Sequence, residues 1–190
     1  MILLIDNYDS FSYNLFQLVG GICPDIRVIR NDELSVSEIF ALSPSHIILS
    51  PGPGRPADAG VCEDVIRENA ARETPVPLLG VCLGHQAICE SFGARITYAK
   101  RLMHGKKSLI EAHGTLFNGI EGGFYVARYH SLAAADEGFP EELSVTARTD
   151  DGEIMAVEHK TMPIYGVQFH PESILTQHGR KIAENFISIK

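Results

Sequence analysis

Short apolar runs alternate with amphipathic stretches along the first half of the chain. The apolar runs predict strands at 2–5, 26–29, 46–49 and 76–81. The amphipathic stretches predict helices at 11–19, 35–42, 61–72 and 83–92, the first with Asp9 or Ser10 as its N-cap. Strands and helices that alternate at this spacing predict an α/β fold, in which a parallel sheet carries helices on both faces.

The pattern changes after Gly93. Strand-like segments at 94–99, 108–112, 124–128, 143–148, 154–159 and 164–169 are separated by turns rich in Gly, Asp and Pro. A last amphipathic stretch predicts a helix over 173–186. We therefore expect a smaller mixed or antiparallel extension of the sheet in the C-terminal half. Because no linker, repeat or low-complexity tract interrupts the chain, we expect residues 1–190 to form a single domain.

The junction between the strand at 76–81 and the helix at 83–92 carries the first candidate chemistry. Its sequence is Gly-Val-Cys-Leu-Gly-His-Gln, residues 80–86. Glycines on both sides of Cys82 permit the sharp turn of a nucleophile elbow, which exposes the side chain above the sheet. The start of the helix favours the thiolate form of a cysteine. The backbone N–H of Leu83 is placed to bind an oxyanion. This junction predicts an activated nucleophile.

A base and its orienting group follow the last predicted strand, in the sequence Gln-Phe-His-Pro-Glu-Ser at 168–173. His170 can take the thiol proton and return it to a leaving amine, and Glu172 can hold the imidazole in one tautomer. A lone histidine is more often structural than catalytic. Because His170 has Glu172 beside it and the chain also has a cysteine elbow, the sequence favours a catalytic triad of Cys82, His170 and Glu172.

Further polar positions have both a structural and a functional interpretation. The Ser-Pro-Gly-Pro-Gly turn at 50–54 is by itself a rigid surface turn, but it follows a strand that we expect beside the elbow strand, so Gly52 N–H is a candidate second oxyanion donor. Gln86 lies one helical turn after Cys82 and can bind a polar head group. Ser131 belongs to a turn or binds substrate. His85 is a rival base, which we expect to pack away from the thiol.

Composition excludes several classes of function. The net charge of −8 leaves no basic surplus for nonspecific nucleic-acid binding. No apolar run approaches the roughly 18 residues of a membrane span, and the start of the chain has no basic segment typical of a signal peptide. The four cysteines lack the spacing of a zinc site or a disulfide framework, so we interpret Cys23, Cys62 and Cys89 as packing residues. This usage favours a reducing compartment, and we expect a cytoplasmic protein.

The motifs around Cys82, His170 and Glu172, together with the turn at 50–54, resemble those of class I (triad-type) glutamine amidotransferases. The opening Asp-Asn-Tyr-Asp-Ser-Phe at 6–11, Met-His-Gly-Lys at 103–106 and Arg-Tyr-His-Ser-Leu at 128–132 narrow the resemblance. They are similar to the glutaminase subunits of anthranilate synthase and of aminodeoxychorismate (p-aminobenzoate) synthase. The resemblance runs from end to end of the chain.

This resemblance implies a flavodoxin-like fold and the hydrolysis of L-glutamine to glutamate and ammonia through a thioester on Cys82. It implies an oxyanion hole at Gly52 and Leu83. It also implies a glutamine site formed by Gly52, Gly54, Gln86, Ser131 and Leu132. The ammonia would pass to a larger subunit that aminates chorismate. No cofactor is implied for this chain, because magnesium is expected on the partner subunit.

Several alternatives stay open at this point. Synthesis of anthranilate for tryptophan is slightly favoured over synthesis of p-aminobenzoate for folate, and one glutaminase can serve both. A free-standing thiol hydrolase would use the same triad without a partner, whereas a noncatalytic binding module would leave the three residues a coincidence. If a partner completes the site, Met103–Lys106 and the loop at 7–10 are candidate interface segments, because their polar residues have no evident packing role.

Overall fold

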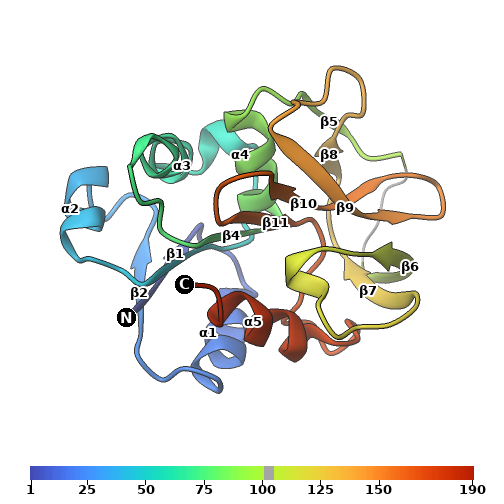
Figure 1. Ribbon diagram of the computed structural model, residues 1–190, viewed down its shortest axis with the longest axis horizontal. Coiled ribbons are helices and arrows are strands. Elements are labelled where there is room, and N and C mark those ends of the chain that lie inside the picture. The colour runs from blue at the N-terminus through green and yellow to red at the C-terminus, as the bar shows by residue number, and fades with distance from the viewer. Residues whose placement is uncertain (101–104) are drawn as a thin grey trace.

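The computed structural model describes residues 1–100 and 105–190, and within these residues nine strands form one sheet (Figure 1). The strand order is β2-β1-β3-β4-β11-β10-β9-β6-β7. The first five strands in this order are parallel: β2 (Ile26–Arg30), β1 (Ile2–Asp6), β3 (His46–Leu49), β4 (Leu78–Val81) and β11 (Ile164–Val167).

The other half of the sheet is antiparallel. It consists of β10 (Ile154–His159), β9 (Leu143–Thr149), β6 (Lys106–Ala112) and β7 (Phe124–Arg128). A separate antiparallel pair joins β5 (Ile96–Tyr98) to β8 (Leu132–Ala134). Two short 3₁₀ helices occupy Pro56–Asp58 and Thr115–Phe117. The predicted antiparallel extension is confirmed, and most of it continues the main sheet.

Helices cover both faces of the parallel strands (Figure 1). One face carries α1 (Ser12–Gly20) and α5 (Gly179–Ile187), and the other carries α2 (Val36–Ala41), α3 (Cys62–Ala71) and α4 (Leu83–Ser91). Successive side chains of β1 alternate between the two layers, as the strand period requires: Ile2 and Leu4 pack in one core, whereas Leu3 and Ile5 pack in the other. The predicted three-layer α/β fold is therefore confirmed.

One predicted N-cap and one predicted helix start are wrong. Helix α1 has Phe11 at its N-cap position, and the Asp9 carboxylate accepts from the Phe11 N–H at 2.7 Å instead of capping the helix itself. Helix α5 starts at Gly179, six residues later than predicted, because the preceding segment bonds to the edge of β7. There Gln177 N–H donates to the carbonyl of Tyr125 at 2.9 Å. An amphipathic pattern does not show that a backbone N–H bonds to a strand instead of within a helix.

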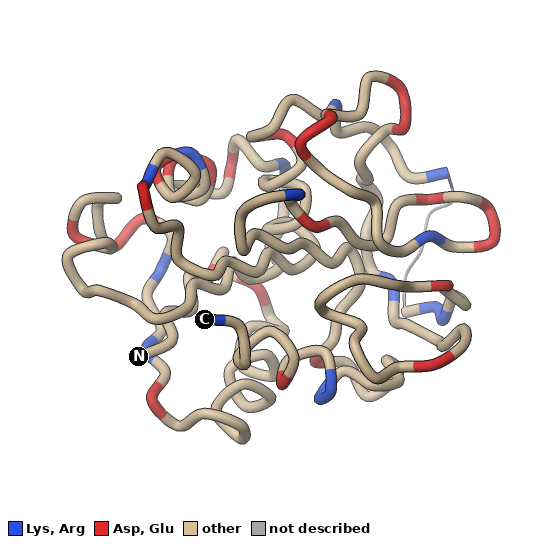
Figure 2. The backbone as a smooth tube through the Cα atoms, viewed as in Figure 1, with Lys and Arg blue, Asp and Glu red and all other residues tan. Residues whose placement is uncertain are grey.

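Charged residues lie mostly in the loops and outer helices (Figure 2). The central strands β3, β4 and β11 carry none. Chemistry on this sheet must therefore come from the loops that leave the strand ends. Among the described residues, no helix combines the length and the apolar character needed to cross a bilayer.

Candidate active site

Three neighbouring parallel strands bring the predicted motifs to one edge of the sheet. Strand β4 lies between β3 and β11, with Val81 opposite Val167 and Gly80 opposite Leu49. The carboxyl ends of these strands therefore meet, and the segments that start at Ser50, Cys82 and Gln168 leave side by side. The expectation that the 50–54 turn lies beside the elbow is confirmed.

Cys82 has the strained backbone of a nucleophile elbow, with φ of 52° and ψ of −98° at the start of α4. A positive φ is costly for a residue with a side chain and requires support from its surroundings. The flanking glycines provide it. A Cβ on Gly80 would collide with the backbone of Gly84, and a Cβ on Gly84 would lie 2.6 Å from the carbonyl oxygen of Leu49. Both glycines are needed for the close approach of helix to strand.

His170 and Glu172 form a buried pair next to this cysteine. Nδ1 of His170 lies 2.7 Å from Oε1 of Glu172, and their side chains are 3% and 0% exposed. The other ring nitrogen, Nε2, is buried and has no hydrogen-bond partner among the described residues, and Cys82 is the other side chain that interacts with the imidazole. Burial alone would lower the pKa of His170, but Cys82 and Glu172 together raise this pKa to about 10. The imidazole is therefore held protonated at neutral pH beside the sulfur.

Contacts with strand β7 and with two aromatic rings fix the position of His170. The backbone N–H of His170 donates to the carbonyl of Ala127 at 3.2 Å, and its backbone carbonyl accepts from the Thr176 hydroxyl at 2.6 Å. The rings of Phe11 and Tyr129 meet the imidazole edge-on, with centroid distances of 5.6 and 4.9 Å. These rings limit the access of water. No role was predicted for Phe11 or Tyr129, although both lie within the motifs that carried the resemblance.

A cavity of roughly 400 Å³ opens above Cys82. It is lined by Gly52, Pro53, Gly54, Cys82, Leu83, Gln86, Tyr129, His130, Ser131 and Leu132. The structure thus gathers every predicted oxyanion-hole and glutamine-binding residue around the thiol. The Gly52 backbone packs so closely that a Cβ there would lie 2.8 Å from Cδ2 of Leu83. Gly52 and Leu83, whose N–H groups are the two proposed oxyanion donors, therefore lie next to each other in the wall of this cavity.

A buried charge cluster supports the 130–132 wall of this cavity. Nε of Arg128 donates to Nε2 of His130 at 3.1 Å, so Nδ1 carries the ring proton and donates to the carbonyl of Leu132 at 2.9 Å. Arg128 also forms an ion pair with Glu153, and the two side chains are 1% and 3% exposed. Burial lowers the pKa of His130 to about 3, with the Arg128 charge adding to the effect. Glu153 lies in none of the motifs, and no role was predicted for it.

His85 and the other cysteines have structural positions. His85 is fully buried against Gly166, and burial lowers its pKa to about 4, so it is neutral and packs away from the thiol as expected. Burial raises the pKa of Cys89, and it raises that of Cys62 to about 12. Cys23 is half-buried against the core. All four cysteines are free.

The loop at 7–10 has a packing role that was not predicted from its polar sequence. Asn7 is 3% exposed, and its backbone N–H and Nδ2 donate to the Oγ and carbonyl of Ser50 at 2.8 and 2.9 Å. The premise that the polar residues of this loop have no packing role is therefore wrong for Asn7, because its side chain fixes the turn that carries Gly52. Tyr8 in the same loop is 55% exposed. Of the other candidate interface segment, Met103 and His104 lie outside the described residues.

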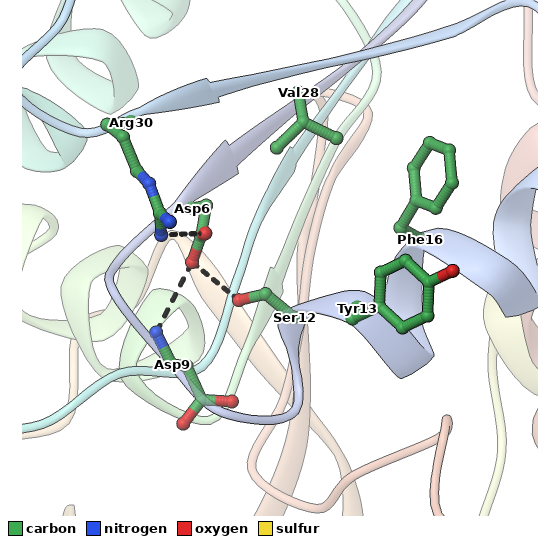
Figure 3. Close-up of a pocket in the computed structure, with 7 residues that line it drawn as sticks. All are labelled: Asp6, Asp9, Ser12, Tyr13, Phe16, Val28 and Arg30. Atoms are coloured by element: carbon green, nitrogen blue, oxygen red, sulfur yellow. Dashed lines mark hydrogen bonds and ion pairs between the residues drawn. The ribbon is translucent and has the colours of Figure 1, made fainter.

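A second cavity, of roughly 360 Å³, lies beside α1 and contains none of the triad (Figure 3). Its buried polar groups bond to one another. The Asp6 carboxylate pairs with Arg30 and accepts from the Ser12 hydroxyl at 2.6 Å and from the Asp9 N–H at 3.3 Å. The Asp6 charge in this cavity is therefore already neutralised. In the described residues, no group of three or more His, Cys, Asp or Glu side chains forms a metal-binding cluster.

Fold and site together define a class: an α/β enzyme with a cysteine in a nucleophile elbow. Comparisons with known proteins identify the family. The sequence model described as "Glutamine amidotransferase class-I" matches residues 3–189, and the chain belongs to this family.

Similar proteins carry names of two related synthases. The chain is 52% identical to "Anthranilate synthase component 2" of Pseudomonas aeruginosa, with 98% of this chain and 94% of that protein covered. It is 48% identical to "Aminodeoxychorismate/anthranilate synthase component 2" of Bacillus subtilis, with 98% and 95% covered. It is 50% identical to "Bifunctional protein TrpGD" of Thermotoga maritima over its whole length, but it spans only 32% of that protein.

A solved structure supports the fold assignment. The crystal structure of a putative GMP synthase subunit from Thermoplasma acidophilum matches with a TM-score of 0.85 at 28% identity, covering 98% of this chain and 91% of that chain. Both the amidotransferase fold and the family identified from the motifs are thus confirmed.

Proposed function

We propose that Cys82, His170 and Glu172 hydrolyse L-glutamine and that the ammonia passes to a larger, chorismate-aminating synthase subunit. The observation that carries this proposal is the strained backbone of Cys82, beside a buried His170 whose Nδ1 lies 2.7 Å from Oε1 of Glu172. The names of the relatives support the pathway, since they name components of anthranilate synthase and of aminodeoxychorismate/anthranilate synthase.

The first half of the reaction starts from a thiolate and an imidazolium. The Cys82 sulfur attacks the side-chain amide carbon of glutamine, and the carbonyl oxygen becomes an oxyanion held by the N–H groups of Leu83 and Gly52. His170 then donates its proton to the amide nitrogen. Ammonia leaves as the C–N bond breaks, and a thioester on Cys82 remains.

The second half regenerates the enzyme. His170, now neutral, takes a proton from water, and the resulting hydroxide attacks the thioester carbon. The C–S bond breaks, glutamate leaves, and the thiolate again faces an imidazolium. Throughout, Glu172 holds the tautomer of His170 and stabilises its positive charge. Gln86, Ser131, Leu132 and Gly54 line the cavity and would hold the substrate's head group.

The synthase partner is part of the proposal. A glutaminase that acted alone would waste glutamine, so we expect the larger subunit to complete the active geometry. The names favour a synthase of anthranilate, and the name of the Bacillus subtilis relative favours a subunit that also serves aminodeoxychorismate synthesis. The four free cysteines support a reducing, cytoplasmic location.

The test is glutamine hydrolysis by the full chain, alone and with each larger subunit. We expect strong stimulation by the cognate subunit and a loss of at least about 10⁴-fold in Cys82→Ala. Cys23→Ala, a half-buried cysteine outside the site, is the matched control and should keep its activity. Full activity of the chain alone would instead indicate an independent thiol hydrolase, and activity in Cys82→Ala would exclude the triad.

A further inference from the structure

Gln168 lies beside the nucleophile and has no role in the triad. It follows Val167 at the end of β11 and is 0% exposed. Its backbone N–H donates to the carbonyl of Met155 at 2.8 Å, while the N–H of Cys82 donates to the carbonyl of Val167 at 2.9 Å. These bonds fix Cys82 and Gln168 next to each other at the ends of adjacent strands.

The side-chain amide of Gln168 has its orientation set by Gln86. Nε2 of Gln86 donates to the carbonyl of Leu132 at 2.9 Å and to Oε1 of Gln168 at 3.1 Å. Both amide hydrogens of Gln86 are thereby used. The oxygen of Gln168 must face Gln86, since a flipped amide would bring two N–H donors together. Nε2 of Gln168 is then directed at Sγ of Cys82, at 3.6 Å.

From this geometry we propose that Gln168 is a positioning residue, which donates a hydrogen bond to the Cys82 sulfur and ties it to the substrate-binding loop. The chain of contacts runs from the sulfur through Gln168 and Gln86 to the carbonyl of Leu132. The proposal rests on the proposed function, in which Cys82 is the nucleophile.

A fixed N–H donor at the sulfur acts in both halves of the reaction. Before attack it stabilises the thiolate over the thiol and restricts rotation about the Cα–Cβ bond, so that the sulfur is held toward the cavity. During hydrolysis of the thioester, sulfur is the leaving group and regains negative charge, which the same donor stabilises. Removing the donor should therefore lower kcat more than it changes KM.

Three variants separate this role from simple packing. Gln168→Met keeps the approximate volume and removes the amide. Gln168→Glu keeps an oxygen for Gln86 and places an acceptor against the sulfur. Gln17→Met is the matched control, because it makes the same substitution of Gln by Met at an exposed position of α1.

The measurement is the rate of Cys82 alkylation by iodoacetamide as a function of pH in the full chain, followed by peptide mass spectrometry. For Gln168→Met we expect the midpoint of the profile to rise by about one pH unit, the value of one hydrogen bond to a charged group. Gln168→Glu should shift the midpoint further, and Gln17→Met should leave it unchanged. In the complex with the synthase subunit, kcat of Gln168→Met should fall about 10-fold, with KM changed by less than about threefold.

The possible outcomes are distinct. Superimposed alkylation profiles for wild type and Gln168→Met, or an effect on KM alone, would overturn the role of Gln168 and leave the triad standing. A Cys82 that reacts at no pH in the wild type would instead overturn the proposed nucleophile. If Gln168→Met does not fold, as judged by circular dichroism, Gln168→Asn replaces it. This variant keeps the amide but withdraws it from the sulfur, and it should move the midpoint in the same direction.

Discussion

Nδ1 of His170 lies 2.7 Å from Oε1 of Glu172, and a single residue, Pro171, separates them in the chain. The ring of Pro171 restricts the backbone between the two side chains. The carboxylate is thus held at the Nδ1 edge of the imidazole, which leaves Nε2 available to Cys82. Together with Cys82, the Glu172 carboxylate raises the pKa of His170 to about 10.

Glu172→Gln should lower kcat by about 10³-fold with little loss of stability, because the amide keeps the shape but not the charge that stabilises the imidazolium. The pKa of His170, now about 10, should fall toward its ordinary value. Steady-state kinetics of the complex over a range of pH would measure both effects. Glu184→Gln, a change at a partly exposed carboxylate on α5, is the control. Unchanged kcat in Glu172→Gln would contradict the orienting role.

Gly84→Ala should disrupt the elbow, since its Cβ would lie 2.6 Å from the Leu49 carbonyl oxygen and force α4 away from β3. We expect the free energy of unfolding to fall by about 1–3 kcal/mol and alkylation of Cys82 to slow. Urea denaturation and iodoacetamide labelling would measure these changes. Gly20→Ala is the matched control, because its Cβ would meet Ile26 at an ordinary 3.7 Å. Equal stability of the two variants would contradict the packing argument.

Glu153→Gln should destabilise the protein by about 3–5 kcal/mol, because it leaves the Arg128 charge buried and uncompensated. The 130–132 wall should loosen as well, so KM for glutamine should rise. Breaking the exposed ion pair of Arg95 with Glu137, whose side chains are 66% and 87% exposed, should cost about 0–1 kcal/mol. Thermal denaturation of Glu153→Gln and Glu137→Gln compares the two pairs. A small loss in the first variant would show that the buried pair is dispensable.

Acid should destabilise the fold through two buried histidines. The pKa values of His85 and His130 are about 4 and 3 in the folded chain, below the ordinary 6.5, because burial disfavours the charged form. The stability that they contribute is present above pH 6.5 and is lost as the pH falls toward 4. Each group contributes a slope of up to about 1.4 kcal/mol per pH unit. Urea denaturation between pH 6.5 and 5 should show a smaller slope for His85→Leu than for the wild type.

His113→Gln, a change at an exposed histidine, is the control for this acid dependence. The contribution of His170 to stability depends on pH in the opposite direction. Its raised pKa contributes stability that is complete below pH 6.5 and is lost as the pH rises toward about 10, so it adds nothing to the acid slope. An identical slope in His85→Leu and the wild type would contradict the burial argument.

The sequence predicted the parallel half of the fold well, because β1, β3 and β4 are continuous apolar runs and each is followed by a helix with its own periodicity. It failed where backbone groups bond outside regular elements. The segment before α5 has a helical pattern, yet the N–H of Gln177 donates to the carbonyl of Tyr125 in β7. Similarly, Asn7 looked like a surface residue, although it is buried against Ser50.

Cys82, His170 and Glu172 were identifiable from the sequence because local rules suffice: glycines permit a strained turn at Cys82, and two residues of spacing join His170 to Glu172. Only the tertiary structure brings these three residues together, because β4 and β11 pair in register although they lie more than 80 residues apart in the chain. The same pairing brings Gln168 to the sulfur, and the antiparallel half of the sheet brings Glu153 under the substrate wall. Sequence periodicity reports which face of an element is buried, but not which distant element buries it.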